Sequence, residues 1–333
     1  MANLKDLQKQ AEAENTTDEV AQQSVEDYGS LAEVDTTPVT SAPIAQGVWG
    51  EIMDAAEYLP DNQTFMGLVG PEGVGKTGVV LDSLTDEEVK RGDVIFVLDF
   101  DGGGQTIRTS HHRSIAKNIR VLNPNVMQTG DARDSFDYPA THRRVMNIGR
   151  TLVEWAAKPG DRPLLHSVLV TGIDQWDAVA SNCMFIEDLG TAPDGIGAKI
   201  KPHEQIGMRF NWQIRSTRFH QLTAISKTLM GLGVRVYWET HFKDIQDKSG
   251  AILGKKAAWE KNTNMQLNQI LWFHKSKVRD ENNAPTGEMR YEVEFVKCRT
   301  NPELLDQRRL IMRTKKGESP EWYGLPELQE GRV

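Results

Sequence analysis

The chain of 333 residues contains few of the features that mark secreted and membrane proteins. Its two cysteines, Cys183 and Cys298, lie far apart in the sequence. This excludes a disulfide framework and a Cys-based zinc site, and it fits a reducing compartment. No apolar run approaches the length of about 18 residues that a membrane-spanning helix needs, so we expect no such segment. The first residues include no apolar stretch typical of a secretory signal, and we therefore expect a cytoplasmic protein.

Basic residues are too few to make the whole chain cationic. The sequence has 47 acidic and 39 basic side chains, which gives a formal net charge of −8. Nine acids against two lysines give residues 1 to 45 a net charge of −7, which leaves −1 for the other 288 residues. This balance argues against a uniformly basic nucleic-acid-binding surface but permits local basic clusters.

The composition divides the chain into three parts. Residues 1 to 45 have few large apolar side chains, and we expect a disordered acidic tail that binds another protein, mimics nucleic acid or simply aids solubility. Helical spacing of apolar residues from 48 to 59 predicts a helix at the start of a domain spanning residues 46 to 315. Residues 316 to 333 form a C-terminal extension, and we expect its end to be frayed.

Apolar runs and helical patterns alternate through the domain. Buried strands are predicted at residues 64 to 69, 94 to 98, 119 to 122, 164 to 173 and 234 to 240. Helices are predicted at residues 76 to 91, 141 to 157 and 210 to 232. Alternating polarity then predicts antiparallel strands at residues 270 to 274, 288 to 298 and 310 to 313. The pattern indicates an α/β fold with a mostly parallel central sheet flanked by helices and with antiparallel strands added at the C-terminal end.

The most informative stretch follows the first predicted strand, where residues 70 to 77 match the pattern G-x-x-x-x-G-K-[ST]. Its glycines let backbone N–H groups close around phosphate oxygens, so ATP and Mg²⁺ are the expected cofactors. Lys76 would reach the β- and γ-phosphates, and the Thr77 hydroxyl would bind Mg²⁺. The alternative is a glycine turn with a solvated lysine. The residues expected to bind the nucleotide are Gly70, Pro71, Glu72, Gly73, Val74, Gly75, Lys76, Thr77 and Gly78.

Polar residues at the ends of apolar strands supply candidates for catalysis, because ligands of open parallel sheets bind beyond the strands' carboxyl ends. Asp174 is the expected Mg²⁺ ligand, with Asp177 as a weaker substitute. Asp101, close to Asp99, would orient or deprotonate a water molecule. His241 would face the γ-phosphate and report its presence to the following loop. The alternative for each aspartate is a helix cap or a turn.

Cations occur at three further places. Lys297 and Arg299 end a predicted strand on the same side of the pleat, and they could reach a neighbouring subunit's nucleotide in trans. Two polar loops could contact nucleic acid, since cations track phosphates and an aromatic ring offers a stacking face. Solvated surface is the alternative throughout. The residues expected to contact nucleic acid are Lys199, Lys201, Lys255, Lys256 and Trp259.

This succession of motifs, from the phosphate loop through Asp101, Asp174 and His241 to Lys297 and Arg299, resembles the RecA/RadA-like branch of P-loop ATPases. Within it the chain is most similar to phage and archaeal-virus RecA-like proteins of single-strand annealing and recombination. The resemblance implies that Asp101 is the catalytic acid and Asp174 the Walker B acid, with His241 as the sensor. It also implies trans-acting roles for Lys297 and Arg299. Aspartate stands at 101 where the family has glutamate, and no polymerisation motif is recognisable.

The resemblance implies a Mg²⁺-dependent ATPase that acts on single-stranded DNA in phage-type recombination or replication. It also implies a homo-oligomer, ring or filament, with nucleotide at the subunit interface and a location in the host cytoplasm if the protein is viral. One alternative is a DNA packaging or helicase-type motor. Another is a nucleotide-gated binding or assembly protein with little turnover.

Overall fold

The computed structural model of the chain describes residues 64 to 128, 136 to 188, 209 to 247 and 249 to 331. They belong to one compact unit, Tyr58–Val333. The predicted acidic tail, the helix expected over residues 48 to 59, and Lys199 and Lys201 lie outside the described residues.

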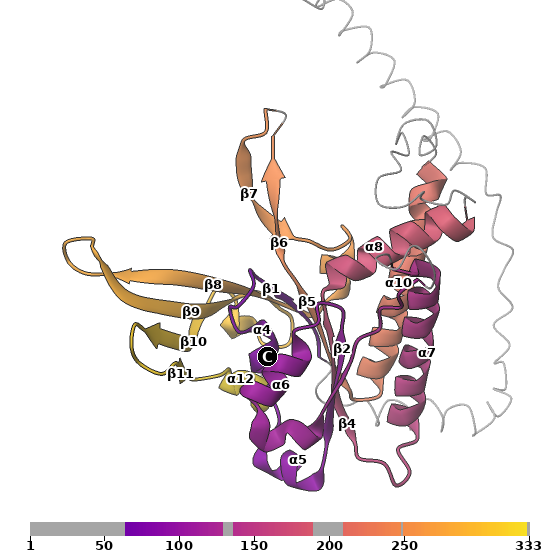
Figure 1. Ribbon diagram of the computed structural model, residues 1–333, viewed down its shortest axis with the longest axis horizontal. Coiled ribbons are helices and arrows are strands. Elements are labelled where there is room, and N and C mark those ends of the chain that lie inside the picture. Colours follow the sequence, from indigo (N-terminus) through magenta and orange to yellow (C-terminus); the bar gives the residue numbers. More distant parts are fainter. Residues whose placement is uncertain (1–63, 129–135, 189–208, 248, 332–333) are drawn as a thin grey trace, which may run out of the picture. The chain divides into compact units, whose positions relative to one another are not determined.

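A nine-stranded sheet forms the centre of this unit (Figure 1). In spatial order its strands are β11 (Glu321–Trp322), β10 (Arg308–Lys315), β9 (Pro285–Cys298), β8 (Gln269–Arg279), β1 (Phe65–Val69), β5 (Arg235–Thr240), β4 (Leu165–Thr171), β2 (Val94–Asp99) and β3 (Ile119–Leu122). The six strands from β8 to β3 are parallel, and β8 to β11 pair antiparallel. The α/β class with a mostly parallel sheet and C-terminal antiparallel strands is therefore confirmed. The C-terminal ends of the six parallel strands lie along one side of the sheet, the carboxyl edge. Their N-terminal ends lie along the opposite side, the amino edge.

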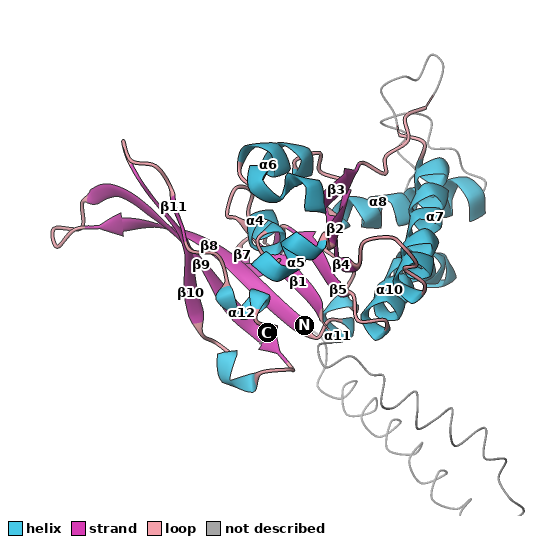
Figure 2. Cartoon of the chain, turned by 90° about the horizontal axis from the view of Figure 1, so that it is seen from below, coloured by secondary structure: helices cyan, strands magenta, loops and turns pink. Residues whose placement is uncertain are grey.

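Helices cover both faces of the sheet (Figure 2). One face carries α7 (Tyr138–Ala157), α8 (Ile173–Cys183) and α10 (Arg209–Gly231), whose apolar side chains form a core with Trp238. The other face carries α4 (Lys76–Leu81), α5 (Asp86–Arg91), α6 (Gly104–Ser110) and α12 (Pro326–Gln329), which pack around Tyr237 and Leu271. Short helical segments complete the unit: η1 (Arg113–Asn118), η2 (Met184–Asp188), α11 (Thr263–Gln266) and η3 (Pro302–Leu304).

Two stretches differ from the sequence prediction. The single helix expected over residues 76 to 91 is broken, because Thr85 caps a new helix, α5, through a reciprocal capping box with Glu88. The C-terminal end expected to be frayed instead forms α12, and Leu325 and Leu328 are buried in the same core as α4. Residues 316 to 331 are therefore part of the domain's packing.

The predicted polar loop after His241 is a β-hairpin, β6 (Phe242–Gln246) and β7 (Ile252–Ala257), which projects from the carboxyl edge (Figure 1). Its register places Lys243 opposite Lys256 and Asp244 opposite Lys255. The apolar side chains Ile252 and Leu253 are 61% and 70% exposed, so pairing between the two strands and not core burial maintains the hairpin.

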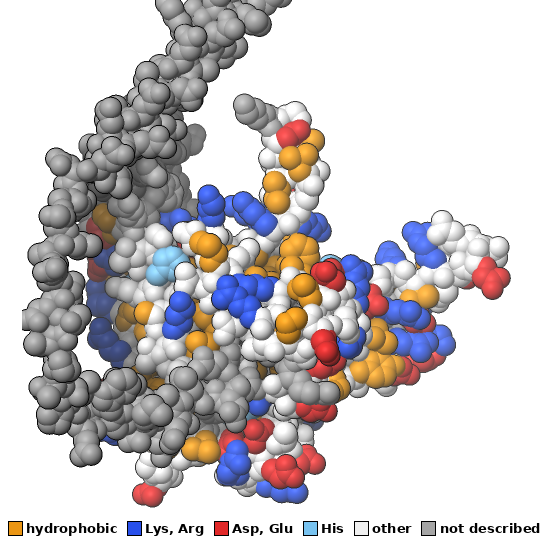
Figure 3. Space-filling view, turned by 180° about the vertical axis from the view of Figure 1, so that it is seen from behind, with side chains coloured by type: hydrophobic (Ala, Val, Ile, Leu, Met, Phe, Trp, Pro, Cys, Tyr) orange, Lys and Arg blue, Asp and Glu red, His pale blue; other side chains and the backbone are white. Residues whose placement is uncertain are grey.

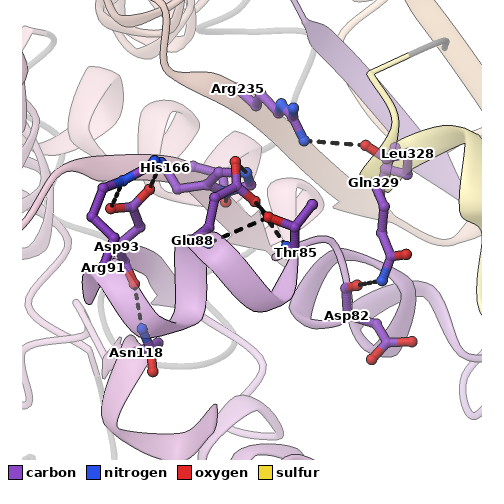
Figure 4. Close-up of polar contacts among 11 residues, drawn as sticks. Asp82, Thr85, Glu88, Arg91, Asp93, Asn118, His166, Arg235, Leu328 and Gln329 are labelled. Carbon is purple, nitrogen blue, oxygen red and sulfur yellow. Dashed lines mark hydrogen bonds and ion pairs between the residues drawn. The ribbon is translucent and has the colours of Figure 1, made fainter.

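The amino edge contains a buried histidine, His166 at the start of β4 (Figure 4). Its side chain is 5% exposed, and its Nε2 atom lies 3.6 Å from Oε1 of Glu88. Burial, and next the nearby cation of Arg235, lower the pKa of His166 from 6.5 to about 4. The imidazole is therefore neutral in the folded protein at pH 7.

We expect protonation of His166 to weaken the fold as the pH falls from 6.5 to about 4. In this window the unfolded chain binds the proton and the folded chain does not, so about 3 kcal/mol of stability present at neutral pH is lost on acidification. Denaturant unfolding near neutral and acid pH measures the change. A His166→Gln variant should lose about 3 kcal/mol less than the natural protein. Equal losses in the two proteins would contradict this assignment.

Candidate functional site

The predicted phosphate loop lies at the carboxyl edge, between β1 and α4. Its glycines Gly73 and Gly75 have φ values of 67° and 93°, a region that side-chain-bearing residues rarely adopt. At its start, the Gly70 backbone N–H donates to the carbonyl of Thr240 at 3.2 Å, which ties the loop to the end of β5. The strand, loop and helix thus follow one another as the motif requires.

The Lys76 side chain points back into this loop. Its ammonium donates hydrogen bonds to the carbonyl oxygens of Gly70 and Pro71, both at 2.8 Å. The same Nζ atom lies 3.6 Å from Oε1 of Glu239, and the lysine side chain is only 3% exposed. The ammonium is therefore a buried positive charge surrounded by oxygen acceptors.

Glu239, near the end of β5, is the functional candidate that sequence reasoning missed. The Thr77 hydroxyl donates to its Oε2 atom at 2.9 Å. Burial raises the pKa of Glu239, and the ammonium of Lys76 opposes that shift. The rule that predicts Asp174, an acid near the end of an apolar strand, applies equally to Glu239. For this strand the sequence analysis instead predicts a role for His241, two residues later.

Asp101, Asp174 and His241 gather at the ends of β2, β4 and β5. The Gln175 amide donates to Asp101 at 3.0 Å, and Nδ1 of His241 lies 3.8 Å from Oδ2 of Asp174. Partial desolvation, and next the charge of Asp174, raise the pKa of Asp101. Asp174 itself belongs to the first turn of α8, and its Oδ1 atom is buried without a hydrogen-bond partner in the described structure.

Gly172 explains how Asp101 reaches this cluster. It has a φ of 61°, and a Cβ atom there would lie 2.2 Å from Oδ1 of Asp101. Only glycine allows the two strand ends to approach so closely. A side chain at position 172 would therefore displace the carboxylate of Asp101, which follows the neighbouring strand β2.

The other two aspartates have structural partners. Asp99 is 2% exposed and accepts hydrogen bonds from the backbone of Gly102 and Gly104 and from the Thr171 hydroxyl. Asp177 forms an ion pair with Arg215, with Nη2 at 2.5 Å from its carboxylate, which links α8 to α10. Asp99 shapes the turn that contains Asp101, and Asp177 is engaged in the contact between α8 and α10.

Lys297 and Arg299 lie at the amino edge. Cys298 pairs with Gln269 at the start of β8, and Gln269 pairs with Met66 near the start of β1, whereas the phosphate loop follows the end of β1. The Lys297 ammonium donates to the carbonyl oxygens of Asn264 and Leu267, both at 2.6 Å. The two cations are thus separated from their own chain's loop by the length of β1.

Of the lysines expected to contact nucleic acid, the two in the described residues lie on the β6–β7 hairpin. Lys255 and Lys256 are exposed, and Figure 3 shows hydrophobic side chains along the same projecting segment. Trp259 has a different role, because its ring packs on β1 at Gly67, where a Cβ atom would lie 2.4 Å from it. Its indole N–H donates to Asn264 at 2.8 Å. Trp259 is therefore partly buried by packing on β1, and its contact with nucleic acid stays a prediction.

Among the described residues, no group of three or more His, Cys, Asp or Glu side chains is arranged to hold a metal ion by itself. No helix in the described part of the chain has the length and apolarity required to cross a membrane. No protein-family model matches this sequence, and a search of curated proteins finds no match.

Proposed function

We propose that the chain is a RecA-like, Mg²⁺-dependent ATPase that acts on single-stranded DNA in recombination or replication of the phage type. The observation that carries the proposal is the contact of the phosphate-loop residues Lys76 and Thr77 with a buried carboxylate, Glu239, on the adjacent strand. If Lys76 only ended a glycine turn, its side chain would extend into solvent and would not be buried against a carboxylate.

Phosphate oxygens would replace the carbonyl oxygens that now accept from Lys76. The ammonium is already desolvated, so a phosphate would gain a strong charge-assisted hydrogen bond with little further loss of hydration. The glycine loop would contribute backbone N–H groups, which bind anions without adding charge. This arrangement favours a triphosphate over a neutral ligand.

The side chains present fit a magnesium ion that arrives with the nucleotide. Mg²⁺ commonly takes one or two protein oxygens and completes its shell with phosphate and water. The Thr77 hydroxyl and the Glu239 carboxylate are adjacent, and the buried Oδ1 atom of Asp174 has no partner among the described residues. When bound, the ion would neutralise charge on the transferred phosphoryl group.

Asp101 would act as the general base. Its raised pKa makes it a better proton acceptor than an ordinary aspartate, and Gln175 holds it by a hydrogen bond. His241, beside Asp174, would sense the charge of the γ-phosphate, and the hairpin that starts at Phe242 would transmit this change. Lys297 and Arg299 lie at the edge of the sheet opposite their own loop, so in an oligomer they would serve the nucleotide of a neighbouring subunit.

The DNA contact is proposed for the β6–β7 hairpin, because exposed Lys255 and Lys256 lie directly beyond His241. Phosphate release with Mg²⁺ and ATP, measured with and without single-stranded DNA, tests the proposal. We expect DNA to stimulate release, and a Lys255→Ala, Lys256→Ala double variant to keep its basal rate while losing most of the stimulation. Two lost phosphate contacts should also reduce the slope of log affinity against log salt by about 1.4.

The matched control replaces Lys90 and Lys117, two exposed lysines that precede strands at the amino edge, with alanine. This control should respond to DNA like the natural protein. Tight ATP binding without phosphate release would favour a nucleotide-gated assembly protein. Absence of ATP binding would refute the proposal.

A further inference from the structure

The C-terminal segment places an aromatic ring against the phosphate loop. Trp322, on the edge strand β11, supplies the atoms nearest to Gly75 at the end of the loop and to Gly78 in α4. Cβ atoms at these two positions would lie 3.2 Å and 3.0 Å from its six-membered ring. The indole N–H donates to Oδ2 of Asp82 at 2.8 Å, which holds the ring in one orientation over α4. The two glycines therefore leave the space that the ring occupies.

Packing against α4 leaves part of the Trp322 ring exposed. Trp322 remains 37% exposed, whereas the residues that anchor the same segment, Leu325 and Leu328, are 4% and 3% exposed. Those leucines already attach the segment to the core, so attachment does not need a large open ring beside the loop. Gly78 directly follows Thr77, and in a nucleoside triphosphate only the sugar separates the base from the α-phosphate.

From this juxtaposition we propose that Trp322 is the platform on which the nucleobase of the bound nucleotide stacks. Every base offers a π-face, so a tryptophan beside the loop contributes affinity through stacking, with modest selectivity among bases. The inference rests on the proposed nucleotide site and names the part of it that recognises the nucleoside. The β11 strand thereby becomes part of the binding site.

Competition binding with ATP and with inorganic tripolyphosphate, both with Mg²⁺, separates base recognition from phosphate recognition. A Trp322→Ala variant should bind ATP roughly 5- to 100-fold more weakly, the range expected for loss of one base stack. Its affinity for tripolyphosphate should be unchanged. A Trp322→Phe variant, which keeps a ring on Gly75 and Gly78, should recover most of the ATP affinity.

Neighbouring Tyr323 provides the control, since it is also exposed and its hydroxyl donates to Glu321. A Tyr323→Leu variant should bind both ligands normally. Equal weakening of ATP and tripolyphosphate by Trp322→Ala would mean that the ring only shapes the loop, and unchanged ATP affinity would mean that it does not meet the base. Either result overturns the inference while the nucleotide site stands. If the natural protein binds neither ligand, the proposed function fails as well.

Discussion

A Lys76→Met variant is expected to lose ATP binding by roughly a hundredfold or more, and to be less stable than the natural protein even without nucleotide. The first effect follows from removal of the only ammonium that is hydrogen-bonded within the described phosphate loop. The second follows because the Glu239 carboxylate, with a side chain 9% exposed, would remain buried without its cation. Breaking a buried ion pair on one side costs about 3–5 kcal/mol.

A second substitution separates these two effects. In a Lys76→Met, Glu239→Gln double variant the buried negative charge is gone, so most of the lost stability should return while ATP binding stays absent. Denaturant unfolding and equilibrium nucleotide binding provide the two measurements. Recovery of ATP binding in the double variant would show that Lys76 acts on the fold alone and makes no contact with phosphate.

An Asp101→Asn variant is expected to keep ATP binding and to hydrolyse ATP about 10²- to 10⁴-fold more slowly, the range typical for loss of a general base. Asparagine has nearly the same shape, so it retains the hydrogen-bonding position beside Gln175 and the close approach to Gly172. Single-turnover phosphate release, compared with equilibrium nucleotide binding, distinguishes chemistry from affinity. A rate close to that of the natural protein would exclude Asp101 as the base.

The pH dependence supplies an independent measurement of the same role. The raised pKa of Asp101 should move the acid limb of the pH–rate profile above that of an ordinary aspartate, because the base works only when deprotonated. Asp174→Asn removes a neighbouring negative charge and should shift that limb to lower pH. An unmoved limb would mean that another group controls the profile.

The candidate site has a physical link to the hairpin that we propose as the DNA contact. His241 lies between Asp174 and the first residue of β6, and its backbone carbonyl accepts from Ala258 at 2.9 Å. A change at the histidine therefore reaches both ends of the hairpin. The C-terminal segment approaches the loop on the face of the sheet that carries α4, opposite the face that carries α8. A bound nucleotide would therefore meet the loop, the Asp174–His241 pair and the C-terminal segment.

Much of the parallel sheet could be predicted from the sequence, because its strands are short apolar runs that need no distant partner to be recognised. The glycine-rich loop after β1 was also predictable, since its glycines, lysine and threonine lie within residues 70 to 77. The β6–β7 hairpin was not, because its strands are mostly exposed and contain lysine, aspartate and glycine in place of an alternating apolar face. The prediction of a frayed C-terminus was wrong. Leu325 and Leu328, which anchor it, are isolated apolar residues in a polar stretch and give no periodic pattern.

The sequence by itself determined the loop that could hold a phosphate and the acids that follow apolar strands. Tertiary structure alone decided which of those groups meet. It set Glu239 against Thr77 because β5 lies beside β1, placed Lys297 and Arg299 at the far edge because β9 runs antiparallel to β8, and set Trp322 against Gly75 and Gly78. Local pattern specifies what a residue can do, whereas strand order and direction, which arise from long-range pairing, specify its neighbours.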